Sequence, residues 1–368
     1  MRTTLVMLVN QLRNSGPNRV MLDIARNIDR QKITPVVISL MPDSHVRPIA
    51  DSFFEEGIEI KRFNYSKLEL ELKTKSIARI IEEYISNHFM NPVVQAHGYH
   101  PTLLAAHMHL PHTATIHCIA SEDFIASKGR LLGTYMVHRF KHNLKKYSWP
   151  VAISEYMVRY YFKACGEKLQ LIHNGVNFTP WEGSVDNLRN KLAIPFDTRL
   201  IVIPGGLHKR KNNLHTIAQL KKCSNNKFLC IFLGLGDQEN ELKAAVAEDS
   251  RFRFEGYKPN VKEYLACADL YISSSFSEGL PLAALEALCM GVPSLLSDIP
   301  PHNEIASLMG IGGVENFSLN DDSLAEKLDK YLSCDFDRHG ISNRALEKFS
   351  GATMGAKYSE LIARISNK

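Results

Sequence analysis

The stretch SFSEGLPLAALEALCMGVP, residues 275–293, decides the fold of this chain because it combines a strand end, a turn and a short helix. The apolar run 270–272 before it has the pattern of a buried strand. Gly279 then breaks the pattern, and Pro281 suits the first turn of a helix, where a missing N–H is no loss. The residues that continue and end the helix are Leu282, Leu285, Leu288, Gly291 and Pro293.

Two carboxylates flank the start of this expected helix, Glu278 on the turn before it and Glu286 on the helix itself. The N–H groups and the dipole at a helix start favour a phosphate. Ionised carboxylates only accept hydrogen bonds, so they suit hydroxyl groups on either side of a diphosphate, as in a nucleotide sugar. On spacing alone, Glu286 also fits a solvated helix residue, and Glu278 fits a favourable charge at a helix start.

The whole stretch resembles a known signature. Glu278, seven residues and then Glu286, within SEGLPLAALEALCMGVPSLLSD, is similar to the E-x7-E motif of the retaining GT-B glycosyltransferases of family 4. The resemblance implies that Glu278 faces the transferred sugar and is catalytic, and that Glu286 holds the ribose. It also implies that the backbone amides of Gly279, Leu280 and Leu282 cradle the diphosphate, since Pro281 has no N–H to offer.

Residues before this acidic motif resemble a second motif of the same family, which is basic. Residues 204–213, PGGLHKRKNN, follow a strand pattern and are similar to the family's G-R-L-x-x-x-K, whose Arg and Lys neutralise the diphosphate. The lysine falls on Lys211, but the arginine position holds Gly206. Either Arg210 or Lys209 reaches the phosphate from another backbone position, or one phosphate contact is missing. Without the resemblance, the Lys-Arg-Lys run is equally a solvated loop.

Later turns of the same half fit a nucleotide site. Gly256 and Tyr257 follow a strand pattern, and by resemblance they border the nucleobase, on which Tyr257 can stack; a packed loop aromatic is equally compatible. The G-x-G at 234–236 is not completed to G-x-G-x-x-G, which argues against a dinucleotide fingerprint. We expect no metal, because the D-x-D at 335–337 has no phosphate cradle beside it.

The first half alternates strand and helix patterns, as a doubly wound α/β domain does. Gly16 lies in the turn between the first strand and the first helix, where it permits close approach to the donor phosphates or the acceptor, or serves as a plain tight turn. His97 and His117 fall at the carboxyl ends of strands, where open α/β sheets bind ligands. By resemblance, His117 lies near the donor sugar and phosphate, and His97 lies on the acceptor side.

Length and composition fit two domains of an ordinary globular protein: 368 residues, 45% apolar and 23% charged. We expect an α/β GT-B fold with two Rossmann-like domains facing across a cleft. The expected parts are an acceptor-binding domain at 1–178, a nucleotide-sugar-binding domain at 179–350, and a C-terminal helix at 351–368 that packs on the first domain. Seven scattered cysteines and the lack of a long apolar stretch favour the cytoplasm.

Positive charge is concentrated between Lys128 and Lys146, a stretch without an acidic residue in which apolar side chains recur at near-helical spacing. It fits a surface helix with a solvated basic face, or a basic amphipathic helix on the anionic inner face of a membrane or on an acidic acceptor. Nucleic acid is a poor partner, because recognised motifs and stacking aromatics are absent.

These features predict a retaining, metal-independent hexosyl- or N-acetylhexosaminyltransferase without a cofactor. It would move a sugar from a UDP-sugar to a hydroxyl of a saccharide or glycolipid acceptor in cell-surface polysaccharide or lipopolysaccharide biosynthesis. Two alternatives remain open: a GT-B sugar-nucleotide epimerase, which works without an acceptor, and a non-catalytic nucleotide-binding scaffold, which the glycine at 206 favours.

Overall fold

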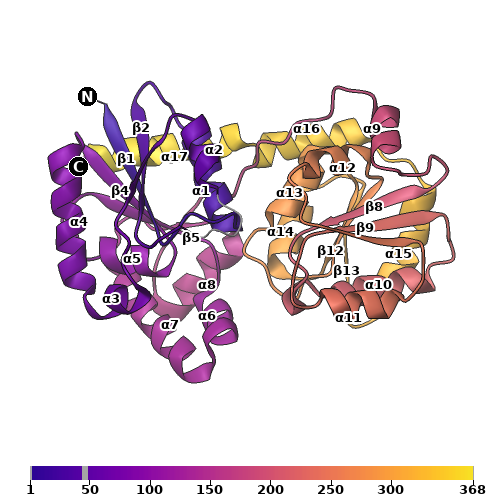
Figure 1. The fold of residues 1–368 in the computed structure, drawn as a ribbon, viewed down its shortest axis with the longest axis horizontal. Helices are drawn as coiled ribbons and strands as arrows, with labels where there is room; N and C mark the ends of the chain where they lie inside the picture. Colours follow the sequence, from indigo (N-terminus) through magenta and orange to yellow (C-terminus); the bar gives the residue numbers. More distant parts are fainter. Residues whose placement is uncertain (1, 44–48, 368) are drawn as a thin grey trace. The chain divides into compact units, whose positions relative to one another are not determined.

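The computed structural model describes residues 2–43 and 49–367, which form two α/β units (Figure 1). The N-terminal domain comprises Met1–Gly175 together with Gly351–Lys368, and the C-terminal domain comprises Val176–Ser350. The chain thus passes from one domain to the other between residues 175 and 176, three residues before the boundary expected from the sequence.

The N-terminal domain is built on a seven-stranded parallel sheet with the order β3-β2-β1-β4-β5-β6-β7. β1 is completely buried, as its unbroken apolar sequence predicts for a central parallel strand. The strands are β1 (Thr3–Val9), β2 (Ile33–Ser39), β3 (Glu59–Arg62), β4 (Pro92–His97), β5 (His112–Ile116), β6 (Val151–Ala152) and β7 (Gln170–Leu171).

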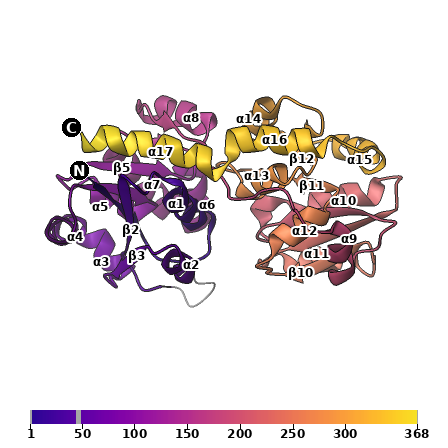
Figure 2. The same ribbon diagram turned by 90° about the horizontal axis from the view of Figure 1, so that it is seen from above.

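Helices cover the sheet of the N-terminal domain, and the last of them comes from the end of the chain. The helices are α1 (Gly16–Asn27), α2 (Ala50–Glu55), α3 (Lys67–Leu72), α4 (Thr74–His88), α5 (Tyr99–Ala105), α6 (Ala120–Lys128), α7 (Arg130–Leu144), α8 (Glu155–Cys165) and α17 (Gly351–Ser366). α17, yellow in Figures 1 and 2, packs against α1, β1 and β4. Its Gly355 approaches α1 so closely that a Cβ there would lie 2.2 Å from the carbonyl oxygen of Asn27.

The C-terminal domain repeats the same plan with six parallel strands in the order β10-β9-β8-β11-β12-β13. The strands are β8 (Arg199–Pro204), β9 (Phe228–Leu233), β10 (Phe252–Gly256), β11 (Leu270–Ser273), β12 (Ser294–Ser297) and β13 (Val314–Phe317). The helices are α9 (Val185–Lys191), the short 3-10 turn η1 (Lys209–Lys211), α10 (Asn213–Lys222), α11 (Glu239–Val246), α12 (Val261–Cys267), α13 (Leu282–Cys289), α14 (Pro300–Met309), α15 (Ser323–Ser333) and α16 (Arg338–Phe349).

Strand order fixes where each domain can bind a ligand. In both sheets the chain first builds outward in one direction and then returns to the other side of the starting strand, β1 or β8. The loops that leave β1 and β4, and those that leave β8 and β11, therefore diverge and open a crevice at the carboxyl ends of these strands. The expected strand–turn–helix stretch leaves β11 at this switch point.

The motif forms as expected, with one correction at its helix start. α13 begins at Leu282 and Pro281 is its N-cap with extended backbone, so the proline precedes the first turn instead of lying in it. Gly291 ends the helix at φ +74°, and a Cβ there would lie 2.3 Å from the Arg338 carbonyl oxygen. The position therefore requires glycine both for its backbone conformation and for close packing against α16.

Replacing Gly355 by Ala tests whether α17 is packed on α1 as tightly as the structure shows. Helix propensity alone would make Gly355→Ala stabilising by about 1 kcal/mol, but the clash with the Asn27 carbonyl should make it destabilising by about 1–3 kcal/mol. The measurement is urea unfolding followed by circular dichroism. Gly16→Ala is the matched control, because it is also helical and has open space around its Cβ position; equal stability of the two variants would contradict the packing.

Candidate functional site

Three charged side chains meet at the switch point of the C-terminal domain. Lys211 and Arg210 lie on η1, in the loop that follows β8, and Glu278 lies in the loop between β11 and α13. Lys211 Nζ is 2.7 Å from Glu278 Oε1, and Arg210 Nη1 is 2.7 Å from Glu278 Oε2. Each carboxylate oxygen of Glu278 is therefore paired with its own cation. The basic run at 209–211 and the acidic motif that begins at Glu278, which the sequence analysis predicted separately, thus lie together.

The Glu278 carboxylate is held ionised although it is nearly inaccessible, with 7% of its side chain exposed. Burial raises the pKa of this carboxyl group, but the positive charges of Lys211 and then Arg210, with their hydrogen bonds, outweigh burial and lower the pKa to about 2. At neutral pH Glu278 is consequently a carboxylate that can only accept hydrogen bonds.

Hydroxyl groups around the β11 loop fix the position of this carboxylate. Ser275 Oγ donates to Glu278 Oε1 at 2.8 Å, and Ser297 Oγ, at the end of β12, donates to the Ser275 carbonyl oxygen at 2.7 Å. His302 Nδ1 on α14 lies 3.0 Å from Ser297 Oγ and 3.1 Å from the Ser297 carbonyl oxygen. Since that carbonyl can only accept, Nδ1 carries the proton, and burial lowers the pKa of His302 to about 4.

A small cavity opens beside the three charged groups at the ends of β8 and β11. Lys211 and Ser275, the two residues that bind Glu278 Oε1, both line it. The other lining residues are Ile203, Pro204, Gly205, Gly206, Asn213, Tyr271, Ile272 and Ser273. This is the position at which an open α/β sheet of this strand order binds its ligand.

Glu286 is buried on α13, with 2% of the residue exposed, so it is not a solvated helix residue. Burial raises the pKa of the neighbouring Tyr271 hydroxyl, and the negative charges of Glu278 and Glu286 raise it further. Glu278 and Glu286 thus act electrostatically on the same hydroxyl group. Gly279, Leu280 and Leu282 lead from Glu278 into the first turn of α13, where the N–H groups of Ala284 and Leu285 donate to the Pro281 carbonyl oxygen.

Gly206, at the position of the family arginine, lies in a tightly packed loop. The loops after β8 and β9 are packed backbone to backbone: a Cβ on Gly234 would lie 1.8 Å from the Gly205 carbonyl oxygen, and one on Gly236 would lie 2.1 Å from that of Leu207. These glycines are therefore explained by steric packing and not by dinucleotide binding. Arg210 and Lys209 are both exposed on η1, and Arg210 reaches Glu278.

Gly256 and Tyr257 lie at the end of β10, two strands from β8. Gly256 has φ +67°, and Tyr257 is 44% exposed, so it is not a packed loop aromatic. Both residues lie in the domain that carries Lys211 and Glu278.

The N-terminal domain brings His97 and His117 together at the ends of β4 and β5. His97 Nδ1 and His117 Nε2 are 3.0 Å apart. Burial lowers the pKa of both imidazoles, to about 4 for His117 and well below the usual range for His97, where His117 contributes further. Both are neutral at pH 7. Gly16 begins α1, and nothing lies within 4 Å of the position a Cβ would take, so the turn is open to a ligand.

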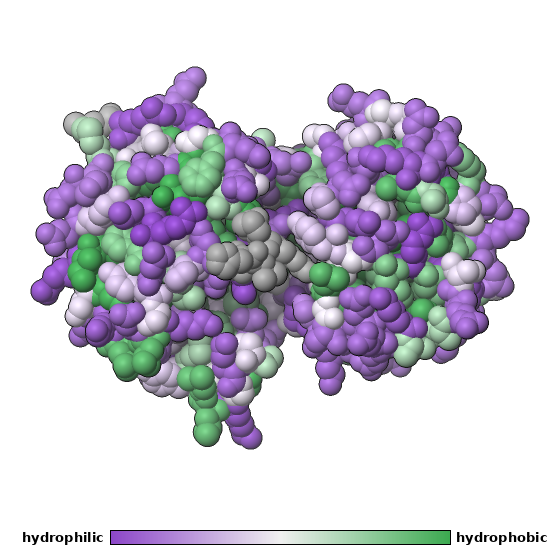
Figure 3. All heavy atoms as spheres, in the orientation of Figure 1, coloured by the Kyte–Doolittle hydropathy of each residue, from purple (hydrophilic) through white to green (hydrophobic). Residues whose placement is uncertain are grey.

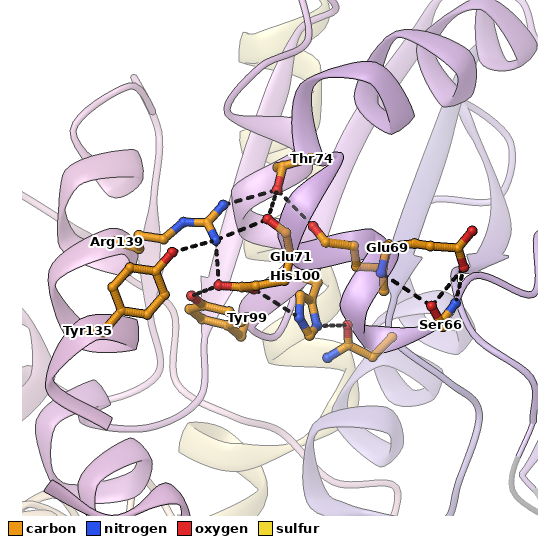
Figure 4. A network of polar contacts seen from close by, with 10 residues as sticks. Ser66, Glu69, Glu71, Thr74, Tyr99, His100, Tyr135 and Arg139 are labelled. Carbon is orange, nitrogen blue, oxygen red and sulfur yellow. Dashed lines mark hydrogen bonds and ion pairs between the residues drawn. The ribbon is translucent and has the colours of Figure 1, made fainter. Parts of the chain in front are cut away.

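A second polar cluster of this domain was missed by the sequence analysis. Glu71 on α3 pairs with Arg139 on α7 and accepts a hydrogen bond from Tyr99 at 3.3 Å, and its other oxygen lies 3.4 Å from His100 Nε2 (Figure 4). Arg139 also donates to Thr74 Oγ1 at 3.0 Å. Glu71 and Arg139 lie 68 positions apart, so no local spacing could have identified this pair.

The D-x-D at 335–337 has structural roles. Asp335 pairs with Arg199 at 2.9 Å, and Asp337 caps α16 by accepting from the Gly340 N–H at 2.8 Å. Within residues 2–43 and 49–367, no three His, Cys, Asp or Glu side chains gather as a metal site would require.

Comparison with known families assigns both domains. Residues 14–179 match the family model "Glycosyltransferase Family 4", and residues 184–348 match "Glycosyl transferases group 1". The two matches follow one another along nearly the whole chain and divide it close to the domain boundary seen in the structure.

Curated relatives match parts of the chain. TuaC of Bacillus subtilis (strain 168), which carries the name of a teichuronic acid biosynthesis glycosyltransferase, is 24% identical over 65% of this chain and 58% of its own length. The O-antigen biosynthesis glycosyltransferase WclY of Escherichia coli is 27% identical over 57% of this chain and 60% of its own. An Escherichia coli UDP-Gal:alpha-D-GlcNAc-diphosphoundecaprenol alpha-1,3-galactosyltransferase is 28% identical over 37% and 38%. The chain therefore spans less than two thirds of each of these relatives.

Solved structures match the whole chain in fold. Anabaena Alr3699/HepE, solved in complex with UDP and glucose, has a TM-score of 0.76 at 17% identity and covers 98% of this chain and 99% of its own. A glycosyltransferase from Rickettsia africae ESF-5 has a TM-score of 0.76 at 18% identity, covering 99% and 98%. These similarities, with two parallel-sheet Rossmann-like domains, confirm the predicted GT-B fold.

Proposed function

We propose that this chain, which belongs to the glycosyltransferases of the group 1 and family 4 type and has a GT-B fold, transfers a sugar from a nucleoside diphosphate sugar to a hydroxyl group of a saccharide or lipid-linked acceptor. One observation carries the proposal: two cations, Lys211 and Arg210, and the start of α13 surround the Glu278 carboxylate at the switch point of the C-terminal domain. Positive groups at this place suit a diphosphate, and the carboxylate suits sugar hydroxyls.

The leaving diphosphate accumulates negative charge as its bond to the sugar breaks. Lys211, Arg210 and the backbone N–H groups at the start of α13 are preorganised to stabilise that charge. We propose that these groups replace a metal ion in the reaction. We also propose that the anomeric configuration is retained by attack on the same face, with the leaving phosphate taking the acceptor proton, since this route needs no protein nucleophile.

A UDP-sugar is the proposed donor. It is supported by two comparisons: HepE was solved with UDP and glucose, and one relative is named for UDP-Gal. In this assignment Glu286 binds the ribose, and Gly256 and Tyr257 border the base. Tyr257 is 44% exposed, and we propose that its ring stacks on the base.

The histidine pair of the N-terminal domain is assigned to hydrogen bonding and not to proton removal. A pKa of about 4 makes His117 a weak base at pH 7. We propose that His117 binds the donor sugar or phosphate, and that His97 and the open turn at Gly16 serve the acceptor side. The names of the relatives support a saccharide acceptor in cell-surface polysaccharide or lipopolysaccharide biosynthesis.

An anionic membrane surface is the proposed location of the acceptor. Leu131, Leu132 and Tyr135 on α7 are 91%, 52% and 50% exposed, and the basic residues Lys128 and Arg130 adjoin them. Figure 3 shows a hydrophobic group projecting beside hydrophilic ones at the lower end of the N-terminal domain, where Figure 1 places α6 and α7. Apolar side chains within a basic patch favour the interface of an anionic bilayer.

We propose that this tip makes the apolar contact with the membrane, within the basic stretch predicted between Lys128 and Lys146. Further along α7, Arg139 is held by Glu71 and Thr74 (Figure 4), whereas Lys145 and Lys146 beyond it are exposed. At the tip, a Cβ on Gly133 would lie 2.6 Å from the Ile125 Cα, so α6 and α7 cross in close contact. The tip is thus presented on a supported hairpin. Among the described residues, no helix combines the length and apolarity needed to cross a bilayer.

Glu278→Ala should reduce transfer by at least 100-fold, because it removes the proposed sugar ligand and frees the two cations to interact with other anions. Glu286→Ala should instead weaken donor binding by about 1.5–3 kcal/mol, the value of a charge-assisted hydrogen bond. The measurements are nucleoside diphosphate release and donor binding, with donors found by a screen of nucleotide sugars with and without acceptor. Lys209→Met, which removes an exposed neighbouring cation, is the control; full turnover by Glu278→Ala would refute the assignment.

Chelation tests the proposed independence from metal. Activity measured in the presence of EDTA should stay within about twofold of the untreated enzyme, because Lys211, Arg210 and the α13 N–H groups supply the positive charge. A loss of activity with EDTA that added Mg²⁺ or Mn²⁺ restores would show that the reaction needs a metal ion.

Replacing both Leu131 and Leu132 by Glu should abolish flotation with vesicles that contain phosphatidylglycerol, since each buried leucine contributes about 1.5–3 kcal/mol. The wild type should bind these vesicles and not vesicles of phosphatidylcholine alone. Met90→Glu is the matched control, because Met90 is a 74% exposed apolar residue outside the hairpin. Absence of wild-type binding at low salt would contradict the membrane proposal.

A further inference from the structure

In this structure the two cations assigned to the diphosphate already bind another anion. Lys211 and Arg210 are both bound by Glu278, the residue assigned to the sugar, through contacts of 2.7 Å. A phosphate that takes the N–H donors these two cations now give to Glu278 must therefore displace the carboxylate. The donor site has an internal anion that competes with its ligand.

Displacement is costly for the carboxylate and easier for Arg210, while the Lys211 side chain is only 19% exposed. Glu278 is 7% exposed, whereas the Arg210 side chain is 52% exposed and can turn to an incoming phosphate. Once its cations have moved, Glu278 keeps the Ser275 hydroxyl as a donor to Oε1. Oε2, which faces Arg210, then needs a new donor, because a buried charge without partners is strongly unfavourable.

We infer that Glu278 makes this site discriminate between the nucleotide sugar and the nucleoside diphosphate that remains after transfer. The inference rests on the proposed function and deepens it. When a nucleotide sugar binds, the hydroxyl groups of its sugar can donate hydrogen bonds to the displaced carboxylate and so replace the lost contacts to the cations. A nucleoside diphosphate takes the same cations but offers Glu278 no donor. Glu278 thereby weakens product binding and returns to Lys211 and Arg210 as the product leaves.

Inorganic pyrophosphate isolates the competition, because it carries the two phosphoryl groups without ribose, base or sugar. In Glu278→Gln the side chain is neutral and no longer holds the cations. We expect isothermal titration calorimetry to give pyrophosphate a dissociation constant at least about tenfold lower in Glu278→Gln than in the wild type, a difference of about 1.4 kcal/mol. UDP should show a change in the same direction.

The matched control is Glu315→Gln in the same domain. Glu315 on β13 is also paired with two cations, Lys327 and Lys330, whose hydrogen bonds and charges lower its carboxyl pKa to about 2. Its replacement changes the net charge as Glu278→Gln does but frees no cation at the switch point, so pyrophosphate affinity should stay within about twofold of the wild type. If pyrophosphate bound both variants more tightly by the same factor, the change in net charge would explain the higher affinity, and the inference would be overturned.

The outcomes separate the inference from the proposed function. Pyrophosphate and UDP that bind the wild type, with unchanged or weaker binding to Glu278→Gln, would overturn the inference alone. No binding of either ligand to the wild type or to Glu278→Gln at millimolar concentration would overturn both. If Glu278→Gln does not fold, Glu278→Asp, whose carboxylate is one methylene shorter, provides the test: pyrophosphate should bind it more tightly than the wild type, and equal binding would overturn the inference.

A second readout concerns the discrimination itself. The donor for this test comes from the nucleotide-sugar screen. The ratio of UDP affinity to donor affinity should rise by at least about tenfold in Glu278→Gln, since the variant should bind UDP more tightly and should lose hydrogen bonds to the sugar of the donor. If Glu278 had a purely structural role, its replacement would weaken the binding of UDP and of the donor together. The ratio of the two affinities would then stay unchanged, and this result would contradict the inference.

Discussion

The placement of one buried carboxylate between two cations is the constraint on which the C-terminal site depends. Glu278 can remain ionised inside the domain only because Lys211 and Arg210 each contact one of its oxygens. The two sides of this contact come from the loops after β8 and β11, strands that are adjacent in the sheet although about seventy residues separate them in sequence. The order of the parallel strands therefore assembles the site.

The loops around this site also explain, by their close packing, why glycine stands at several of their positions. The loop after β8 must pass against the loop after β9, and Gly234 and Gly236 allow their backbones to touch. Within that packed loop, a cation can come from η1 and not from position 206. Arg210 brings a cation to Glu278 from η1, which is why we propose that it takes the place of the family arginine.

Glu278 and the His97–His117 pair show two different ways of burying an ionisable group. In the C-terminal domain the charges remain charged because they are paired, as for Glu278. In the N-terminal domain the histidines at the ends of β4 and β5 remain neutral because burial disfavours the imidazolium, and Glu71 and Arg139 serve to connect helices. This difference supports the proposal that charge stabilisation comes from the C-terminal domain and neutral hydrogen bonding from the N-terminal one.

The sequence by itself determined the features that depend on neighbours along the chain. Apolar periodicity located the strands and helices, and the turn and cap residues around α13 located the motif, because helix and turn formation are local. The burial of Glu286, the pairing of Glu278 with Lys211 and with Arg210, and the link from Glu71 to Arg139 were decided only by the tertiary structure. Each depends on which strands and helices become neighbours, and side-chain distances across a sheet follow from strand order and not from spacing in the sequence.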